Sequence, residues 1–234
     1  MKNYYFHKMP VQQLINDFFD LLFPRTCAGC DQTLVTGELH LCITCRHELP
    51  YHTDQEAIKK KFANRLQLEN EYALLKFNSG GIVQRLLHEI KYRQNPELAI
   101  FIGRLMAERF HNELMESGID LIIPVPLHHS KERTRGYNQS EKLALGIAEV
   151  LAVPIASRAL IRTKKNETQT KKSRGERWQN VANIFEVNEI ELLRNKHVLL
   201  VDDVITTGAT AESCGHALLA AGISQLSLTA LADA

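Results

Sequence analysis

The sequence predicts an α/β protein in which a parallel sheet is flanked by helices and preceded by a small cysteine-rich module. Two apolar runs, 121–125 and 198–201, are typical of strands that are buried on both faces of a parallel sheet. Amphipathic helical patterns lie between and after these runs, as the crossovers of parallel strands require. Two Cys-x-x-Cys motifs near the amino terminus are the third observation.

The composition of the 234-residue chain is that of a globular protein, with 44% hydrophobic and 24% charged residues. A formal net charge of +1 gives no global attraction to nucleic acid or to an anionic membrane, so any such binding must be local. The amino terminus lacks a secretory signal pattern, and no apolar run reaches the roughly 18 residues of a membrane span. We therefore expect a cytoplasmic protein without a membrane span.

The cysteine pattern of residues 1–50 indicates a structural zinc site. Two Cys-x-x-Cys knuckles can close tetrahedrally on Zn²⁺, and an odd total of five cysteines argues against a disulfide framework. A redox dithiol is the alternative, although redox motifs of this kind normally occur singly. Ahead of the knuckles, residues 10–23 have the pattern of an amphipathic helix that docks on the protein or on a membrane surface. The predicted zinc ligands are Cys27, Cys30, Cys42 and Cys45.

Residues 51–234 are predicted to form the main domain. The polar segment 51–70 suits a linker or a loose helix. A strand is expected at 72–77, then a helix that ends at Lys91-Tyr92 and another that starts at Asn95-Pro96, so residues 71–116 are expected to form a helical hood or packing segment. After the helix at 211–221, residues 225–231 supply a closing strand.

A polar, basic segment follows the strand at 121–126. Its residues 128–139 are predicted to form a loop before a helix at 140–150, and the loop reaches the same sheet edge as Asp202. Basic side chains there can bind an anionic group, although charged loops are often only solvated. A second basic segment, 158–177, carries a local charge of +6. It is interpreted as a lid over an anionic ligand, a nucleic-acid contact with Trp178 as a stacking platform, or a solvated loop.

The stretch 198–210 carries the candidate site. Asp202 and Asp203 follow the apolar run where its strand is predicted to end, and ligands of parallel sheets bind beyond the carboxyl ends of the strands. Ionised acids at that position can accept hydrogen bonds from a sugar diol or hold Mg²⁺. A glycine turn into the next helix can bind a phosphate, and the missing Walker lysine disfavours a nucleoside-triphosphate loop. The predicted phosphate cradle comprises Thr206, Thr207, Gly208, Ala209 and Thr210.

Together these motifs resemble the ComF family, competence-associated proteins with a zinc knuckle ahead of a type I phosphoribosyltransferase domain. The similarity covers nearly the whole chain and is most specific at 202–210 and in the segment 133–139, Arg-Thr-Arg-Gly-Tyr-Asn-Gln. It implies a type I phosphoribosyltransferase-like fold. It also implies that Asp202 and Asp203 contact the ribose of phosphoribosyl pyrophosphate, with Mg²⁺ held directly or indirectly, while the loop 206–210 holds the 5′-phosphate.

The resemblance implies further ligand contacts. The pyrophosphate loop would contain Val125, Pro126, Arg133 and Arg135. Two arginines of the second basic segment, Arg162 and Arg174, would join the two acids as catalytic residues, and Arg177 is an alternative to Arg174.

The activity that follows is Mg²⁺-assisted transfer of the phosphoribosyl group with release of pyrophosphate, in a protein associated with competence and DNA uptake. No motif identifies the acceptor. The alternative is a non-catalytic phosphoribosyl-binding or assembly protein that works in DNA uptake, with single-stranded DNA or proteins of the uptake machinery as partners. A third hypothesis, a zinc-dependent nucleic-acid adaptor, leaves residues 202–210 unexplained.

Overall fold

The computed structural model describes residues 24–163 and 184–234 of the chain. The chain divides into two compact units, 1–48 and 49–234, which are described separately. The predicted helix at 10–23 lies outside the described residues, as do residues 164–177 of the second basic segment. Within the described ranges, no helix has both the length and the apolar character needed to cross a membrane.

The smaller unit consists of two knuckles. Cys27 begins a turn whose ends are joined by an antiparallel bridge between Thr26 and Thr33. The second knuckle opens the short helix α2 (Ile43–His47), where the thiol of Cys42 occupies the N-cap and accepts from the Cys45 amide. Each knuckle therefore brings its two cysteines onto one side of a tight backbone turn.

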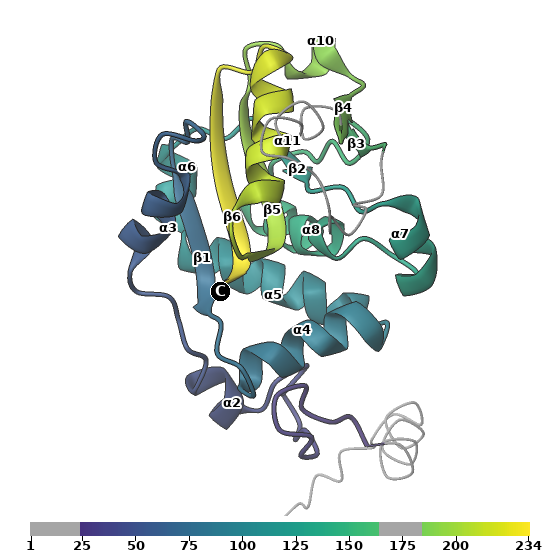
Figure 1. Cartoon of the computed structure of the whole chain (residues 1–234). Helices are drawn as coiled ribbons and strands as arrows, with labels where there is room; N and C mark the ends of the chain where they lie inside the picture. The colour runs from purple at the N-terminus through teal and green to yellow at the C-terminus, as the bar shows by residue number, and fades with distance from the viewer. Residues whose placement is uncertain (1–23, 164–183) are drawn as a thin grey trace, which may run out of the picture. The chain divides into compact units, whose positions relative to one another are not determined.

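The larger unit is built on a four-stranded sheet whose hydrogen-bonded pairs are all parallel. The strand order is β1 (Glu71–Lys76), β6 (Gln225–Asp233), β5 (His197–Ile205) and β2 (Leu121–Pro124). The predicted parallel sheet is therefore confirmed (Figure 1). Strand β5 continues through both acids to Ile205 by pairing with β6, so the loop 206–210 follows directly at its carboxyl end.

Helices cover both faces of this sheet. Figure 1 shows α11 (Ala209–Ala220) in front of β5 and β6, with α5 (Pro96–Arg109) and α8 (Gln139–Leu151) behind them. The remaining helices and the small antiparallel pair are α3 (Gln55–Phe62), α4 (Ile82–Tyr92), α6 (His111–Glu116), α7 (His129–Arg135), α10 (Ile190–Leu193), β3 (Leu160–Arg162) and β4 (Phe185–Val187).

Local sequence explains several helix boundaries. The side chain of Asn95 accepts from the Leu98 amide at 3.1 Å and caps α5, with a proline in the first turn as predicted. The segment 51–70, for which the sequence allowed a linker or a loose helix, contains α3. The predicted loop at 128–139 is wrong in part, because α7 occupies its centre and ends at Gly136, whose φ is +82°.

Two glycines let helices α5 and α8 cross with their backbones in contact. A Cβ on Gly103 would lie 2.2 Å from the Leu143 carbonyl oxygen, and one on Gly146 would lie 2.0 Å from that of Ile100. Neither position can carry a side chain without separating the helices. The crossing fixes α5 against the helix that packs on β2 and β5.

Candidate functional site

The loop that leaves β5 has the geometry of an anion cradle. Gly208 adopts φ +77°, and α11 begins at the next residue, so the helix amino terminus opens toward the loop. A Cβ on Gly208 would lie 2.7 Å from the Phe62 ring, so both the backbone angle and the space require glycine. Thr206 and Thr207 are exposed, and the Thr207 hydroxyl accepts from the Ala209 amide at 3.4 Å.

Helix α3 and the residues after it bind this loop from behind. Lys61 donates to the carbonyl oxygen of Thr206 at 3.1 Å and to Asp233 at 2.6 Å. Arg65 donates to the carbonyl oxygen of Thr207 at 2.9 Å and pairs with Glu212 of α11. Because Lys61 and Arg65 bind the carbonyl oxygens of residues 206 and 207, the loop is held in one conformation while the two threonine side chains stay exposed. Sequence reasoning missed Lys61 and Arg65, because no local pattern links them to Thr206 and Thr207, which follow 145 and 142 residues later.

Asp202 lies buried near the carboxyl end of β5. It accepts from the Ser140 hydroxyl at 3.3 Å and from the Asp203 amide at 2.8 Å. Burial, followed by the charge of Asp203, raises the pKa of Asp202 to about 7, despite opposing hydrogen bonds and the charge of Lys91. This carboxyl therefore changes its protonation state near neutral pH.

Asp203 has different surroundings. Successive strand residues point to opposite faces of a sheet, and its Oδ2 forms an ion pair of 2.9 Å with Nζ of Lys91 from α4. Both side chains are largely but not fully buried, with exposed fractions of 18% and 21%. Sequence reasoning assigned Lys91 no role in the site, because no local pattern links the end of α4 to Asp203.

The segment after β2 folds onto α4. The buried Val125 donates its amide to Val201 at 2.8 Å, and Asn138 donates to the Val125 carbonyl oxygen at 3.0 Å. The Arg135 guanidinium donates to Gln139 at 2.8 Å and lies over the Tyr92 ring, 5.5 Å from its centroid. Tyr137 also donates its hydroxyl to the Ile90 carbonyl oxygen, at the end of α4. These contacts hold 135–139 against the helix that carries Lys91.

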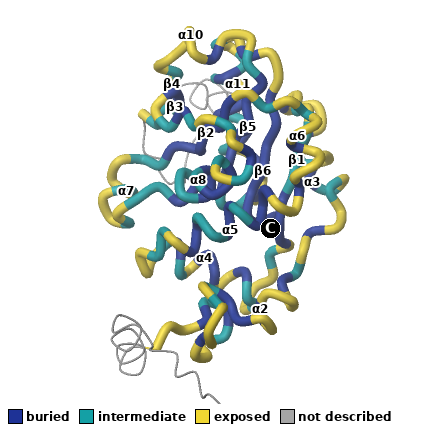
Figure 2. The backbone as a smooth tube through the Cα atoms, turned by 180° about the vertical axis from the view of Figure 1, so that it is seen from behind, coloured by how far each residue is buried: buried dark blue, intermediate teal, exposed yellow. Residues whose placement is uncertain are grey.

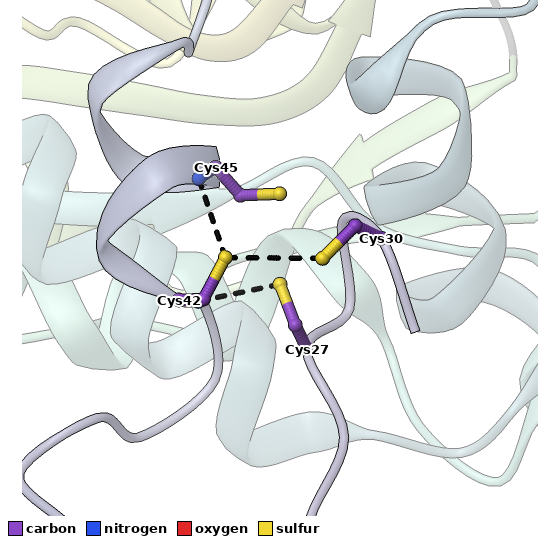
Figure 3. A group of neighbouring side chains, drawn as sticks. All are labelled: Cys27, Cys30, Cys42 and Cys45. Carbon is purple, nitrogen blue, oxygen red and sulfur yellow. Dashed lines mark hydrogen bonds between the residues drawn. The ribbon is translucent and has the colours of Figure 1, made fainter. Parts of the chain in front are cut away.

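The four cysteines of the smaller unit converge (Figure 3). Their sulfur atoms all lie within 4.8 Å of one another, and those of Cys30 and Cys42 are 3.8 Å apart. Tetrahedral Zn²⁺ with bonds of about 2.3 Å requires sulfur separations of about 3.8 Å, so the donor set fits. Burial would raise the pKa of Cys27, but hydrogen bonds from the Cys42 and Gly29 amides outweigh burial and lower this pKa to about 7. Burial and the neighbouring thiols instead raise the pKa of Cys45, so the case for a metal site rests on the positions of the four sulfur atoms.

Comparison with known proteins identifies both parts. Residues 91–234 match the phosphoribosyl transferase domain, and residues 18–64 match the double zinc ribbon domain. The chain belongs to the phosphoribosyl transferase domain family. The zinc ribbon match and the cysteine cluster together support a structural zinc site.

The curated relatives confirm the ComF resemblance. Competence protein F of Haemophilus influenzae is 29% identical over 89% of this chain and 90% of its own length. Competence protein ComFC of Bacillus subtilis is 27% identical over 85% of this chain and 79% of its own length. DNA utilization protein YhgH of Escherichia coli O157:H7 is 33% identical, but over only 58% of this chain and 61% of its own length.

A solved structure aligns with part of this chain. A purine phosphoribosyltransferase from Pyrococcus horikoshii aligns with 61% of this chain and 75% of its own, at 19% identity and a TM-score of 0.37. The assignment of the fold rests on the family match and on the parallel sheet.

The phosphoribosyl transferase domain brings some of the predicted site residues together. The loop 206–210, Asp202 and Asp203 lie at the end of β5, beside the end of β2 where Val125 and Pro126 follow. Arg133 is exposed on α7, and Arg162 lies in β3 with its guanidinium 5.4 Å from the centroid of the Phe185 ring. Arg174 lies outside the described residues.

Proposed function

We propose that this chain binds phosphoribosyl pyrophosphate at the carboxyl ends of β5 and β2 and transfers its phosphoribosyl group to an acceptor. The observation that carries the proposal is the loop 206–210. Its left-handed glycine, its exposed hydroxyls and the start of a 12-residue helix suit a phosphate monoester, and α3 holds the loop in place before the ligand arrives.

The acids of β5 would hold the ribose. A 5′-phosphate in the loop 206–210 places the sugar over the end of β5, where the partly exposed carboxylate of Asp203 can accept from one ribose hydroxyl. Asp202 would accept from the other hydroxyl once its buried carboxyl loses its proton. The pyrophosphate would then lie toward the end of β2, near the backbone of Val125 and Pro126. Arg162 and Arg174 remain proposed catalytic residues, and Arg133 and Arg135 remain proposed pyrophosphate ligands.

The chemical step is a displacement at the anomeric carbon. The bond between this carbon and the pyrophosphate oxygen breaks, and pyrophosphate leaves with the electron pair. The acceptor forms the new bond to the same carbon and releases its proton. In this scheme the chain contributes positioning of the sugar and donors to the leaving group.

Magnesium does not fit as an ion held directly by the two acids. Asp202 and Asp203 point to opposite faces of the sheet, one is buried with a raised pKa, and the other is paired with Lys91. Bound Mg²⁺ would neutralise charge on the pyrophosphate, and this ion is normally held by substrate phosphates and water.

Titration calorimetry of Asp203→Asn and Asp202→Asn against three ligands tests the proposal. Hydrogen bonds to charged groups contribute roughly 1.5–3 kcal/mol, so each change should weaken phosphoribosyl pyrophosphate and ribose 5-phosphate by about one to two orders of magnitude. Inorganic phosphate, which would contact only the loop 206–210, should bind as before. Equal sugar-phosphate affinities in wild type and both variants would remove the ribose role of the acids.

A second candidate is a non-catalytic phosphoribosyl-binding protein that works in DNA uptake. The specific observation in its favour is that Arg135 and Tyr137 contact α4 and Gln139, so part of the segment proposed for pyrophosphate is already bound within the protein. The names of the relatives refer to competence and DNA utilization.

Incubation with phosphoribosyl pyrophosphate, Mg²⁺ and a panel of bases, amines and oligonucleotides distinguishes the candidates. Pyrophosphate release indicates transfer, whereas tight binding without release indicates the second candidate.

A further inference from the structure

Asp203, one of the two acids proposed to bind the ribose, forms an ion pair with Lys91. The Lys91 ammonium lies 2.9 Å from Oδ2 of Asp203, from the last turn of α4. A hydrogen bond from Tyr137 to the Ile90 carbonyl oxygen ties this turn to the segment before α8. Lys91 is thus a cation fixed by the fold at the end of β5.

The pair leaves Asp203 able to bind a sugar. A carboxylate offers about four acceptor positions on its two oxygens, so it can accept from an ammonium and from a hydroxyl at the same time. The partial exposure of both side chains shows that the pair borders the surface and is not sealed in the core. An ammonium on Oδ2 therefore orients the carboxylate without blocking its other acceptor positions.

We propose that Lys91 is a positioning residue of the ribose site, the built-in counter-cation of Asp203, so that the site binds a sugar phosphate without a divalent ion. The inference rests on the proposed function, because it concerns the same ribose site. It goes further by assigning the cation to the chain itself. Ribose 5-phosphate is the right probe, because it lacks the pyrophosphate group that would bind Mg²⁺ and carry this ion into the site.

The experiment is calorimetric titration of ribose 5-phosphate into the full chain, in excess EDTA and again in millimolar Mg²⁺. EDTA also removes zinc, so the EDTA arm is repeated at an EDTA concentration that leaves the zinc content unchanged by metal analysis. Wild type should bind equally in both conditions. Lys91→Met should lose about tenfold or more in affinity in EDTA, because Asp203 loses its counter-cation, and should regain most of that loss in Mg²⁺. Lys91→Arg should stay within about threefold of wild type, since it keeps the charge.

The matched control is Lys196→Met. Lys196 forms an exposed pair of 3.4 Å with Asp120 at the opposite, amino-terminal end of β5, so its loss should leave affinity unchanged. In the Asp203→Asn background, Lys91→Met should cost nothing further. This double-mutant cycle keeps the test valid if Lys91→Met is partly unfolded, because a loss through unfolding would appear in both backgrounds.

Three results would overturn the inference. Wild-type binding that disappears with EDTA would assign the cation to a metal, and unchanged affinity of Lys91→Met in EDTA would leave Lys91 without a role. A loss that Mg²⁺ does not restore would mean that Lys91 contacts the ligand itself. If wild type binds neither ribose 5-phosphate nor phosphoribosyl pyrophosphate under any condition, the proposed function fails instead.

Discussion

The segments that follow β5 and β2 are both polar, and both reach the same edge of the sheet, but the structure uses them differently. After β5, the carbonyl oxygens of Thr206 and Thr207 are bound at α3 while the hydroxyls stay exposed. After β2, a helix forms, and Arg135 and Tyr137 bind residues of α4 and α8. Figure 2 shows β5 mostly buried and α7 mostly exposed. Polar character alone therefore does not distinguish a binding loop from a packing segment.

The largest expected effect is a loss of folding stability when alanine replaces Gly208 of the first segment, compared with the same change at Gly136 of the second. Gly208→Ala forces both a left-handed alanine and a contact of 2.7 Å with Phe62, and should lower the free energy of unfolding by about 2–4 kcal/mol. Gly136→Ala has the same backbone strain but no atom closer than 4.0 Å, and should lose only about 1 kcal/mol. Urea denaturation measures both. Equal losses would mean that the Phe62 contact has no energetic weight.

The buried acid beside the first loop predicts a dependence of stability on pH. The native pKa of Asp202 is raised to about 7, so the native state keeps a proton that the unfolded chain releases near pH 4. This carboxyl's contribution to stability is therefore fully present below about pH 4 and is lost as pH rises to about 7. Between pH 5 and 8 wild type should lose on the order of 2 kcal/mol relative to Asp202→Asn. Parallel curves for the two proteins in urea denaturation at several pH values would contradict this.

Removing a contact behind the first loop should affect ligand binding more than stability. Lys61→Met keeps the length of the side chain but loses the donors to Thr206 and Asp233, and phosphate affinity should fall by about three- to tenfold as the loop loses its fixed conformation. Lys196→Met, at the opposite end of β5, is the control and should leave the phosphate affinity unchanged. Titration with inorganic phosphate provides the measurement, and equal affinities in both variants would show that α3 does not organise the loop.

The smallest expected effect concerns the second segment. Arg135→Gln removes the cation over Tyr92 and should lower the free energy of unfolding by about 0.5–1 kcal/mol. If Arg135 serves packing alone, phosphoribosyl pyrophosphate should bind the variant as it binds wild type. A loss of tenfold or more in that affinity, with ribose 5-phosphate unaffected, would instead support Arg135 as a pyrophosphate ligand.

The sequence predicts the parallel sheet and the cysteine cluster because both depend on local patterns. The apolar run 198–201 indicates a buried strand, and two Cys-x-x-Cys motifs bring four thiols within reach of each other. Strand β5 continues through Asp202 because it pairs with β6. Two consecutive acids do not have the apolar pattern of a buried strand, so the sequence alone does not indicate this pairing. In the same way, the contact of Lys61 with Thr206 joins distant residues, so no local pattern indicates it.

The glycine crossing of α5 and α8 has a consequence for dynamics. Gly103 and Gly146 put the two helix backbones in direct contact. A hinge motion of α5 would therefore have to break this close-packed interface between α5 and α8. Helix α4 packs on α5 and is tied through Ile90 to Tyr137. Entry of a sugar beside Asp203 is therefore expected to leave the pair of Lys91 and Asp203 in place and to need no slow rigid-body opening of a domain.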